Sequence, residues 1–414
     1  GADGEIVEYA VKMQQFPQST LLSHLLEQGD LTEELLRQLA AAIADFHLKA
    51  ETNDYIRDFG TVVNVRESID ENYEQTAGFI GGPQTQQQFD ETKAYTDQFF
   101  ATQPTLLQHR MAQGKIRACH GDLHLNNICY WQDQLLLFDC IEFNEPFRLV
   151  DVMFDIAYII MDLTVQDRRD LAAVFLSHYV ECTGDWDGLQ VLPLYVSRQS
   201  YVRAKVTSFL LGDPSIDEDT KQAASAKAAK YYTLAWSYVQ PRPGQLLVMS
   251  GLSGSGKSTV AQELSRHLGA VYLRSDAVRK HLAGVPLQER GDDSLYTAEM
   301  SQKTYRRLTE LGGRLASQGY TVILDAKFDR MTTRQLAIAQ AQQHKLPLTI
   351  VNCEAPATVL EQRVRDRQGD IADATVAVLA NQQFEPFTPE EKPYVKMVDT
   401  TQPLSPQLAT IVEA

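Results

Sequence analysis

The chain has 414 residues, 44% of them hydrophobic, which is enough for two or three domains that each bury a core. The net charge of −16 is carried by residues 1–243, with 19 Lys+Arg against 35 Asp+Glu, whereas residues 244–414 hold 19 of each. The acidic part would repel a nucleic-acid backbone, so we expect no nucleic-acid partner there. Arg clusters in the neutral part could still hold phosphates or nucleic acid.

The distribution of apolar residues and cysteines argues against a membrane-spanning protein, a secreted protein, a disulfide framework and a zinc site. No apolar run reaches the roughly 18 to 20 residues that cross a bilayer, and no basic stretch with an apolar signal core opens the sequence. The five cysteines form no C-x-x-C pair and are odd in number, unlike a disulfide framework or a zinc site. We expect a cytoplasmic protein with reduced cysteines and no membrane partner.

The first part is predicted to be mostly helical after a strand-like alternation over residues 5–16. Asp30 and Glu33 have the spacing of a capping box at the start of the second helix. Two short strands are expected at 115–119 and 134–138. Apolar residues at helical spacing predict helices over 21–27, 31–49, 90–113, 149–162, 166–183, 190–211 and 216–239.

The second part alternates strands with helical segments, which is typical of a parallel sheet covered on both faces. Two prolines and a glycine in VQPRPGQ, residues 239–245, mark the boundary between the parts. We therefore expect domains over 1–240 and 246–414, with a linker at 241–245. The strands of the second domain are predicted at 245–250, 270–275, 320–325, 346–353 and 394–399.

The segment ACHGDLHLNNICYWQDQLLLFD, residues 118–139, gathers three polar side chains around two predicted strands. Asp122 follows the first strand, Asn127 lies five residues later, and Asp139 ends the apolar run of the second. Two carboxylates and an amide oxygen are hard ligands that suit Mg²⁺ bound to a triphosphate, and one carboxylate can orient or deprotonate an acceptor hydroxyl. The spacing indicates phosphoryl transfer.

HGDLHLNN followed by LLLFDCIEF resembles the catalytic loop and metal-binding segment of the aminoglycoside phosphotransferases, relatives of the protein kinases. The resemblance covers about residues 5–240. It implies a mostly helical C-lobe in which Asp122 is the catalytic base, Asn127 and Asp139 bind the metal, and Asp155 braces the catalytic loop. Glu142 is either a further ligand or a solvated loop carboxylate.

The N-terminal lobe of such kinases is incomplete in this sequence. YAVK, residues 9–12, superficially resembles the strand whose Lys pairs with the α- and β-phosphates. After Lys12, however, the chain passes directly to helices. We interpret residues 5–16 as the end of that lobe, with most of the lobe absent from this sequence.

GLSGSGKS, residues 251–258, matches G-x-x-x-x-G-K-[ST] in full, between a predicted strand and a predicted helix. Backbone N–H groups of such a loop surround phosphates, Lys257 would reach the β- and γ-phosphates, and Ser258 would coordinate Mg²⁺. The motif predicts a site for ATP or GTP with Mg²⁺. The nucleotide-binding residues would be Gly251, Ser253, Gly254, Ser255, Gly256, Lys257, Ser258 and Thr259.

Three further features favour a kinase over a motor or a switch GTPase. Asp276 and Arg279 lie just past the second strand, where a base could meet an acceptor hydroxyl and an Arg could meet an anionic group. Asp325 ends a strand in the position of a Walker B carboxylate. Arg363 and Arg367 lie four apart on one helix face and could close on the transferring phosphoryl group, although Arg363 could equally be a solvated charge.

These residues together resemble the P-loop kinases of the polynucleotide 5′-kinase, gluconate kinase and zeta-toxin group, over residues 245 to about 400. In polynucleotide kinases an Asp-x-x-Arg pair and an Arg-x-x-x-Arg lid serve the acceptor and the phosphates. The resemblance implies those catalytic roles for Asp276, Arg279, Arg363 and Arg367. It also implies a doubly wound α/β fold for the second domain.

The two resemblances predict a bifunctional ATP-dependent phosphotransferase that acts on a hydroxyl of a small molecule or nucleotide. Alternatively, the first domain is a pseudokinase or nucleotide-sensing scaffold that regulates the second. A third interpretation is an NTPase without an acceptor. The sequence does not identify the acceptor, the preference for ATP or GTP, the oligomeric state or any role in drug resistance.

Overall fold

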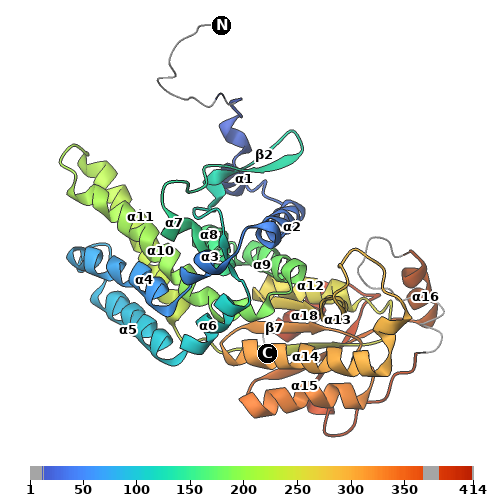
Figure 1. Ribbon diagram of the computed structural model, residues 1–414. Helices are drawn as coiled ribbons and strands as arrows, with labels where there is room; N and C mark the ends of the chain where they lie inside the picture. The colour runs from blue at the N-terminus through green and yellow to red at the C-terminus, as the bar shows by residue number, and fades with distance from the viewer. Residues whose placement is uncertain (1–11, 13, 367–381, 413–414) are drawn as a thin grey trace.

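The computed structural model describes residues 12, 14–366 and 382–412 (Figure 1). It has a mostly helical N-terminal part and a C-terminal part built on a parallel sheet, which Figure 1 shows in blue to green and in yellow to red, respectively. Lys12 is exposed. Most of the strand predicted at 5–16 lies outside the described residues, so the structure does not test it.

The N-terminal part contains short antiparallel strands among its helices. β1 (Ile116–Ala118) pairs with β4 (Leu149–Asp151), and β2 (Ile128–Trp131) forms a hairpin with β3 (Gln134–Leu137). Its helices are α1 (Leu22–Gln28), α2 (Glu33–Lys49), α3 (Asp54–Asp58), α4 (Val62–Thr76), α5 (Gln86–Thr102), α6 (Pro104–Ala112), α7 (Glu145–Arg148), α8 (Val152–Val165), α9 (Arg169–Thr183), α10 (Leu192–Phe209) and α11 (Glu218–Val239).

Three details of the predicted helices are wrong, each for a local reason. Thr32, not Asp30, caps α2, because its side-chain oxygen accepts from the N–H of Leu35 at 3.2 Å. The helix predicted over 90–113 is broken before Pro104, which begins α6 because proline has no N–H to donate to the preceding turn. The helix predicted from 149 begins only at Val152, because residues 149–151 form β4.

The C-terminal part is a five-stranded sheet with all its neighbouring strands parallel, in the order β6-β7-β5-β8-β9. Its strands lie within the predicted ranges or one residue beyond them. They are β5 (Gln245–Ser250), β6 (Val271–Arg274), β7 (Thr321–Asp325), β8 (Leu348–Glu354) and β9 (Val395–Asp399). The accompanying helices are α12 (Lys257–Leu268), α13 (Ser275–Ala283), α14 (Ala298–Ser317), α15 (Met331–His344), α16 (Ala357–Asp366) and α18 (Leu404–Val412).

Alternate residues of β5 pack into two different cores, as a strand covered on both faces requires. Leu246 and Val248 belong to the core that includes Leu311 of α14, whereas Leu247 and Met249 join Val260 of α12 on the other face. The sheet is therefore covered by helices on both faces, as the sequence predicted. Its strands all end at one edge, where ligands bind in open α/β sheets.

The two parts of the chain share one continuous hydrophobic core, which includes residues of α9 and β6. Helix α9 of the helical part also contacts α12 of the sheet part. Polar contacts also cross this boundary: Ser177 accepts from the N–H of Tyr272 at 3.1 Å, and Arg266 pairs with Glu33 at 2.7 Å. None of the helices in the described ranges combines the length and apolar character needed to cross a membrane.

Candidate functional site

The loop between β5 and α12 can take only glycine at two of its turns. Gly251 has a φ of +133°, and a Cβ there would lie 2.4 Å from the carbonyl oxygen of Cys353. Gly254 has a φ of +81°, and its Cβ would lie 2.6 Å from the carbonyl oxygen of Leu360. Both positions combine a left-handed backbone with a close backbone approach, so any side chain would displace the loop.

The loop delivers the chain into α12 with Lys257 as the first helical residue and Gly256 as the N-cap. The Nζ of Lys257 donates to the carbonyl oxygen of Leu252 at 2.7 Å, so the ammonium group lies against the loop. The hydroxyl of Ser255 is buried without a hydrogen-bond partner in the described structure. A lysine folded over a glycine loop, beside an unsatisfied hydroxyl at a helix N-terminus, fits a bound phosphate chain.

Ser258 and Asp325 meet at the carboxyl end of β7. The hydroxyl of Ser258 donates to Oδ2 of Asp325 at 2.7 Å, and the hydroxyl of Tyr272 donates to the same oxygen at 2.5 Å. Burial, followed by the negative charge of Asp325, raises the pKa of the Tyr272 phenol well above its ordinary value. A serine hydroxyl and a carboxylate in contact at a phosphate loop form a donor set that fits Mg²⁺.

Arg363 of α16 is not a solvated helix charge. It is connected to the glycine loop by hydrogen bonds with Thr400. Its guanidinium donates to Oγ1 of Thr400 at 2.8 Å and to the Thr400 carbonyl oxygen at 2.9 Å. The hydroxyl of Thr400 in turn donates to the carbonyl oxygen of Ser255 at 2.9 Å. Arg367, its predicted partner, lies outside the described residues.

The remaining loop residues are placed as follows. Ser253 exchanges two hydrogen bonds with the Gln382 amide, both at 3.0 Å, whereas Thr259 is exposed on α12. The loop thus touches the segment that follows the undescribed residues 367–381.

Asp276 and Arg279 lie on α13, which continues directly from β6. The register pairs Arg274 of β6 with Asp325 of β7, so α13 begins next to the carboxyl end of β7. Arg279 is buried, donates to the Leu295 carbonyl oxygen at 2.8 Å, and keeps its Nε without a partner in the described structure. Asp276 is half-buried. Both residues therefore belong to the edge of the sheet that carries the glycine loop.

Two of the polar residues predicted in segment 118–139, Asp122 and Asn127, contact each other at the base of the β2–β3 hairpin. The amide of Asn127 donates to the Asp122 carbonyl oxygen at 3.0 Å and contacts its carboxylate at 3.4 Å. The N–H of Phe138, the residue before Asp139, donates to the Asn127 carbonyl oxygen at 3.1 Å. Asp139 is exposed and has a φ of +60°, and Glu142 is exposed as well.

His124 sets the electrostatics of Asp122, with which it forms a 3.3 Å contact. Partial burial raises the pKa of the Asp122 carboxyl. The hydrogen bond and charge of His124, with the charges of Arg203 and His120, outweigh burial and lower this pKa below its ordinary value. The carboxylate is therefore ionised at neutral pH and able to accept a proton or bind a cation.

Asp155 is fully buried in α8 and braces the loop that carries Asp122. Its carboxylate accepts from the N–H groups of His120 at 3.1 Å and Gly121 at 2.8 Å. It also contacts Nε2 of His47 at 3.0 Å, and the other ring nitrogen of His47 meets the Tyr179 hydroxyl at 2.8 Å. This is the bracing arrangement that the resemblance implied for Asp155.

His47, Cys119 and Asp155 also bring possible metal ligands within 4.8 Å of one another. The His47 ring and the Asp155 carboxylate are already engaged in the bonds above. Burial and the nearby Asp155 charge raise the pKa of the Cys119 thiol well above its ordinary value, and the thiol contacts the Val150 carbonyl oxygen at 3.6 Å. The three residues therefore support the loop.

Sequence reasoning missed two side chains that support the second site, Tyr272 and Thr400. Tyr272 lies on β6 two residues before the strand ends, where a tyrosine is usually a core residue. Thr400 directly follows β9. Its position after the last predicted strand, at the edge that carries the glycine loop, is the signal that could have identified it.

The comparisons with known proteins concern both the whole chain and its second part. A family model described as an AAA domain matches residues 246–387. An uncharacterized protein of Mycobacterium tuberculosis H37Rv is 27% identical over 383 residues, which cover 91% of this chain and 75% of that protein.

Two named kinases are similar over shorter stretches. The adenylyl-sulfate kinase of Myxococcus xanthus is 30% identical over 155 residues, 36% of this chain and 76% of the kinase. The shikimate kinase of Geobacter sulfurreducens is 28% identical over 137 residues, 32% of this chain and 68% of the kinase. A solved Mycobacterium tuberculosis APS kinase is 23% identical, with a TM-score of 0.34, over 42% of this chain and 98% of that chain.

Proposed function

Because the C-terminal part of the chain belongs to the P-loop kinases of the AAA family, we propose that it transfers the γ-phosphoryl group of ATP to a hydroxyl of a small molecule or nucleotide. The observation that carries the proposal is the contact of Ser258 with Asp325 at 2.7 Å beside the glycine loop. This contact joins a phosphate cradle to a divalent-metal donor set at the ligand-binding edge of the sheet.

Each residue of the loop has a defined task in this proposal. Backbone N–H groups of residues 251–256 and the Lys257 ammonium would hold the β- and γ-phosphates. Ser258 and Asp325 would hold Mg²⁺, which neutralises the phosphate charge when it is bound. Arg363, fixed by Thr400 against the loop, would approach the transferring group from α16. Arg367 would complete that lid.

The acceptor would bind between α13 and the glycine loop. Asp276 is proposed as the base that orients or deprotonates the acceptor hydroxyl, and Arg279 as the cation that holds an anionic group of the acceptor. The kinases similar to this chain are named for shikimate and adenylyl sulfate, both of which carry hydroxyls and a negative charge. An anionic hydroxyl compound is accordingly the acceptor class to screen first.

For residues 1–240 we propose an aminoglycoside phosphotransferase-like domain with a second nucleotide site, joined by the linker 241–245 to the kinase domain at 246–414. In this domain Asp122 would be the base, and Asn127 and Asp139 would hold Mg²⁺. The contact of Asn127 with the Asp122 carboxylate and the bracing by Asp155 support the assignment. The domain would phosphorylate a related hydroxyl compound or the product of the other domain.

Contacts between the two parts favour a second candidate, in which the first part regulates the kinase. Ser177 of α9 accepts from the N–H of Tyr272, whose hydroxyl donates to Asp325. A shift of α9 would therefore be transmitted directly to a proposed metal ligand. This chain of contacts is a physical route by which a nucleotide-sensing first part could alter turnover.

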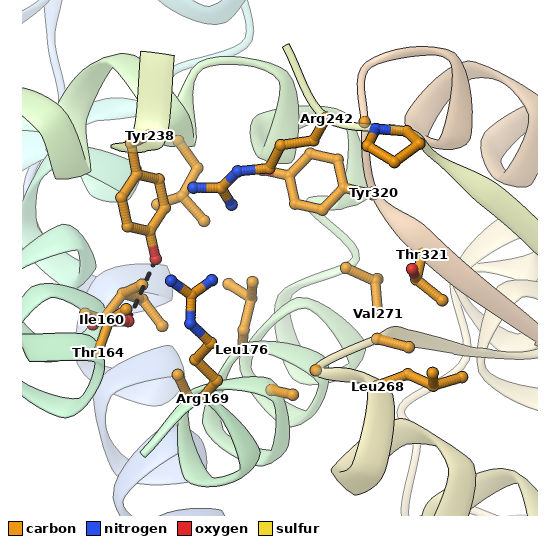
Figure 2. Close-up of a pocket in the computed structure, with 17 residues that line it drawn as sticks. Ile160, Thr164, Arg169, Leu176, Tyr238, Arg242, Leu268, Val271, Tyr320 and Thr321 are labelled. Atoms are coloured by element: carbon orange, nitrogen blue, oxygen red, sulfur yellow. Dashed lines mark hydrogen bonds between the residues drawn. The ribbon is translucent and has the colours of Figure 1, made fainter. Parts of the chain in front are cut away.

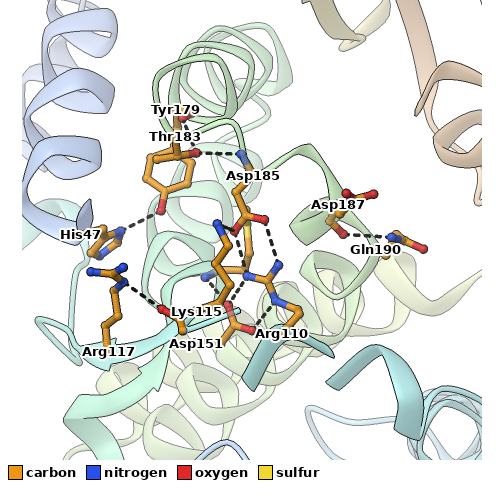
Figure 3. Close-up of polar contacts among 12 residues, drawn as sticks. His47, Arg110, Lys115, Arg117, Asp151, Tyr179, Thr183, Asp185, Asp187 and Gln190 are labelled. Atoms are coloured by element: carbon orange, nitrogen blue, oxygen red, sulfur yellow. Dashed lines mark hydrogen bonds and ion pairs between the residues drawn. The ribbon is translucent and has the colours of Figure 1, made fainter. Parts of the chain in front are cut away.

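A second connection runs through residues 185–187 (Figure 3). Asp185 accepts from buried Arg110 at 3.0 and 3.1 Å, and Arg110 also pairs with Asp151 at 2.5 and 2.6 Å. Two residues on, Asp187 pairs with Arg307 and Arg314 of α14, at 2.5 and 3.0 Å. The buried ion pairs of Arg110 thus fix the position of Asp185, and Asp187, two residues later, connects the helical part to α14.

The two candidates are separated by measuring ATP hydrolysis and phosphate transfer in Asp122→Ala and Lys257→Ala variants of the full chain. Two active sites predict that each substitution removes only part of the turnover. If Lys257→Ala alone abolishes all turnover, the two-enzyme proposal fails and regulation is favoured. Phosphate release that is undiminished in Asp276→Ala would instead indicate an NTPase without an acceptor.

A further inference from the structure

A cleft of about 340 Å³ lies between the two parts of the chain, away from both sites described above (Figure 2). The helical part contributes α8, α9, the start of α10 and the end of α11, and the linker contributes Arg242 and Pro243. The sheet part contributes residues 268–271 and 319–321, which lead into β6 and β7. The cleft therefore lies at the amino-terminal edge of the sheet, opposite the edge that carries the glycine loop.

Two arginines from different elements give the cleft a positive charge. Figure 2 shows the guanidinium groups of Arg169, at the start of α9, and Arg242, in the linker, both directed into the central space beside Tyr238. Arg242 lies over the Tyr238 ring at 4.7 Å and donates to the Ser237 carbonyl oxygen at 2.7 Å. Arg169 is exposed and has no carboxylate partner among the described residues, because the nearby Asp170 pairs with Arg168.

No aspartate or glutamate is among the residues that line the cleft. This local positive charge stands out in a chain whose helical part carries the whole acidic excess, −16. An unneutralised pair of guanidinium groups attracts an anion and repels a cation. Guanidinium groups donate from several N–H groups at once, a pattern that matches the oxygens of a phosphate group.

The rest of the lining is apolar and aromatic, with Leu176 and Val271 opposite the rings of Tyr238 and Tyr320 (Figure 2). The volume lies in the range of small-molecule sites, and such sites combine apolar walls with a few polar groups that fix orientation. We propose that this cleft binds a small organic phosphate, with its phosphate on Arg169 and Arg242 and its apolar or aromatic body against Leu176, Val271 and Tyr320.

Binding would involve both parts of the chain at once, because Arg169 belongs to the helical part and residues 268–271 and 319–321 to the sheet part. The ligand would thereby stabilise the interface along α9, the helix that also contacts Tyr272 through Ser177. The cleft is separate from the proposed catalytic site, because it lies at the opposite edge of the sheet. Its ligand therefore does not have to be a nucleotide, a metal ion or the acceptor.

The test is isothermal titration of the full chain with phenyl phosphate, at about 150 mM salt where screening removes weak surface binding. Inorganic phosphate and benzoate are titrated in parallel. We expect phenyl phosphate to bind more tightly than inorganic phosphate, because its ring contacts the apolar wall, and more tightly than benzoate, because two guanidinium groups match a phosphate. Arg169→Gln and Arg242→Gln should each weaken binding about tenfold.

Arg306→Gln, which removes an exposed arginine on α14, is the matched control and should leave the affinity unchanged. Lys257→Ala should also leave it unchanged, because the glycine loop lies at the opposite edge of the sheet. Arg169→Lys, which keeps the charge and the fold but loses the fork of donors, should bind with intermediate affinity. Each variant is first shown to unfold at the wild-type temperature.

Three results would overturn the proposal. One is an affinity for phenyl phosphate that neither Arg169→Gln nor Arg242→Gln changes. Another is loss of binding in Lys257→Ala alone, which would place the anion on the glycine loop. The third is equal affinity for benzoate and phenyl phosphate, which would remove the argument for a phosphate.

Discussion

Replacing Asp155 by Asn tests whether this carboxylate holds the loop of Asp122 in place. In the folded chain one oxygen accepts from the N–H of Gly121 at 2.8 Å, and the other from His120 at 3.1 Å while it contacts His47 at 3.0 Å. Asparagine offers one acceptor oxygen and one NH₂ group, so at least one of these donors would face another donor in a fully buried site.

The expected cost follows from this geometry. Losing one hydrogen bond to a charged group costs about 1.5 to 3 kcal/mol, and a buried donor left unpaired adds to it. We expect Asp155→Asn to lower the free energy of unfolding by about 2 to 4 kcal/mol, measured by urea denaturation followed by circular dichroism. Asp139→Asn, at an exposed carboxylate, is the control and should change it by less than about 0.5 kcal/mol.

A loss of unfolding free energy in Asp155→Asn no larger than that in Asp139→Asn would show that Asp155 does not hold the loop. Such a result would mean that the loop relaxes without Asp155. A second measurement separates bracing from stability: hydrogen exchange at the amides of His120 and Gly121 should accelerate in Asp155→Asn more than exchange in β5. Equal acceleration in both places would show that the carboxylate stabilises the whole chain and not the loop.

Three further predictions follow from the contacts of the described residues. In the Asp122→Ala background, Ser258→Ala removes the hydroxyl that contacts Asp325 and should lower the remaining ATP turnover about 100-fold, whereas Ser258→Thr should retain most of it. Equal activities of the two variants in steady-state assays would contradict the metal assignment. Because the pKa of Asp122 is lower in the folded chain, its carboxylate adds stability above its unfolded pKa, and this stability is lost as pH falls through the folded pKa. His124 is the main group that lowers this pKa. Between pH 6 and pH 3, His124→Ala should therefore lose less unfolding free energy than wild type, as measured by urea denaturation at each pH. Asp187→Asn breaks half-exposed pairs with α14 and should cost no more than about 1 kcal/mol of unfolding free energy; a loss above about 3 kcal/mol would show that these pairs hold the two parts together.

The sheet part was predicted closely because its sequence carries a strong, local signal. Strands β5 and β7 are short apolar runs bounded by polar residues, and the loop of residues 251–258 fixes where β5 ends and α12 begins. Parallel connectivity then follows from the alternation of strands and helices. What the sequence could not supply is the strand order, because it depends on contacts between distant segments.

The helical part was predicted less well, for reasons visible in particular elements. Helix α4 was missed because its buried positions include Asn72 and Thr76, which give no apolar stripe. Strand β2 was missed because it is only four residues long and pairs with its neighbour across a tight turn. Short elements whose stability comes from tertiary packing leave little periodicity to detect.

The candidate sites show the same division. Spacing within one motif was enough to place Lys257 beside Ser258, and Asn127 close to Asp122. The contact between Arg363 and Thr400 joins segments that lie 37 residues apart, and no spacing rule connects them. Asp325 was predicted from its place at a strand end, but its bond from Tyr272 requires the β6–β7 pairing.

We propose above all that the glycine loop of Lys257 serves phosphoryl transfer to a hydroxyl. The most direct measurement incubates the full chain with γ-³²P-labelled ATP, Mg²⁺ and a panel of anionic hydroxyl compounds, and follows labelled phosphate esters by chromatography. We expect a labelled ester in wild type and in the exposed-lysine control Lys303→Ala, and its loss in Lys257→Ala. An ester formed at the wild-type rate in Lys257→Ala would contradict it.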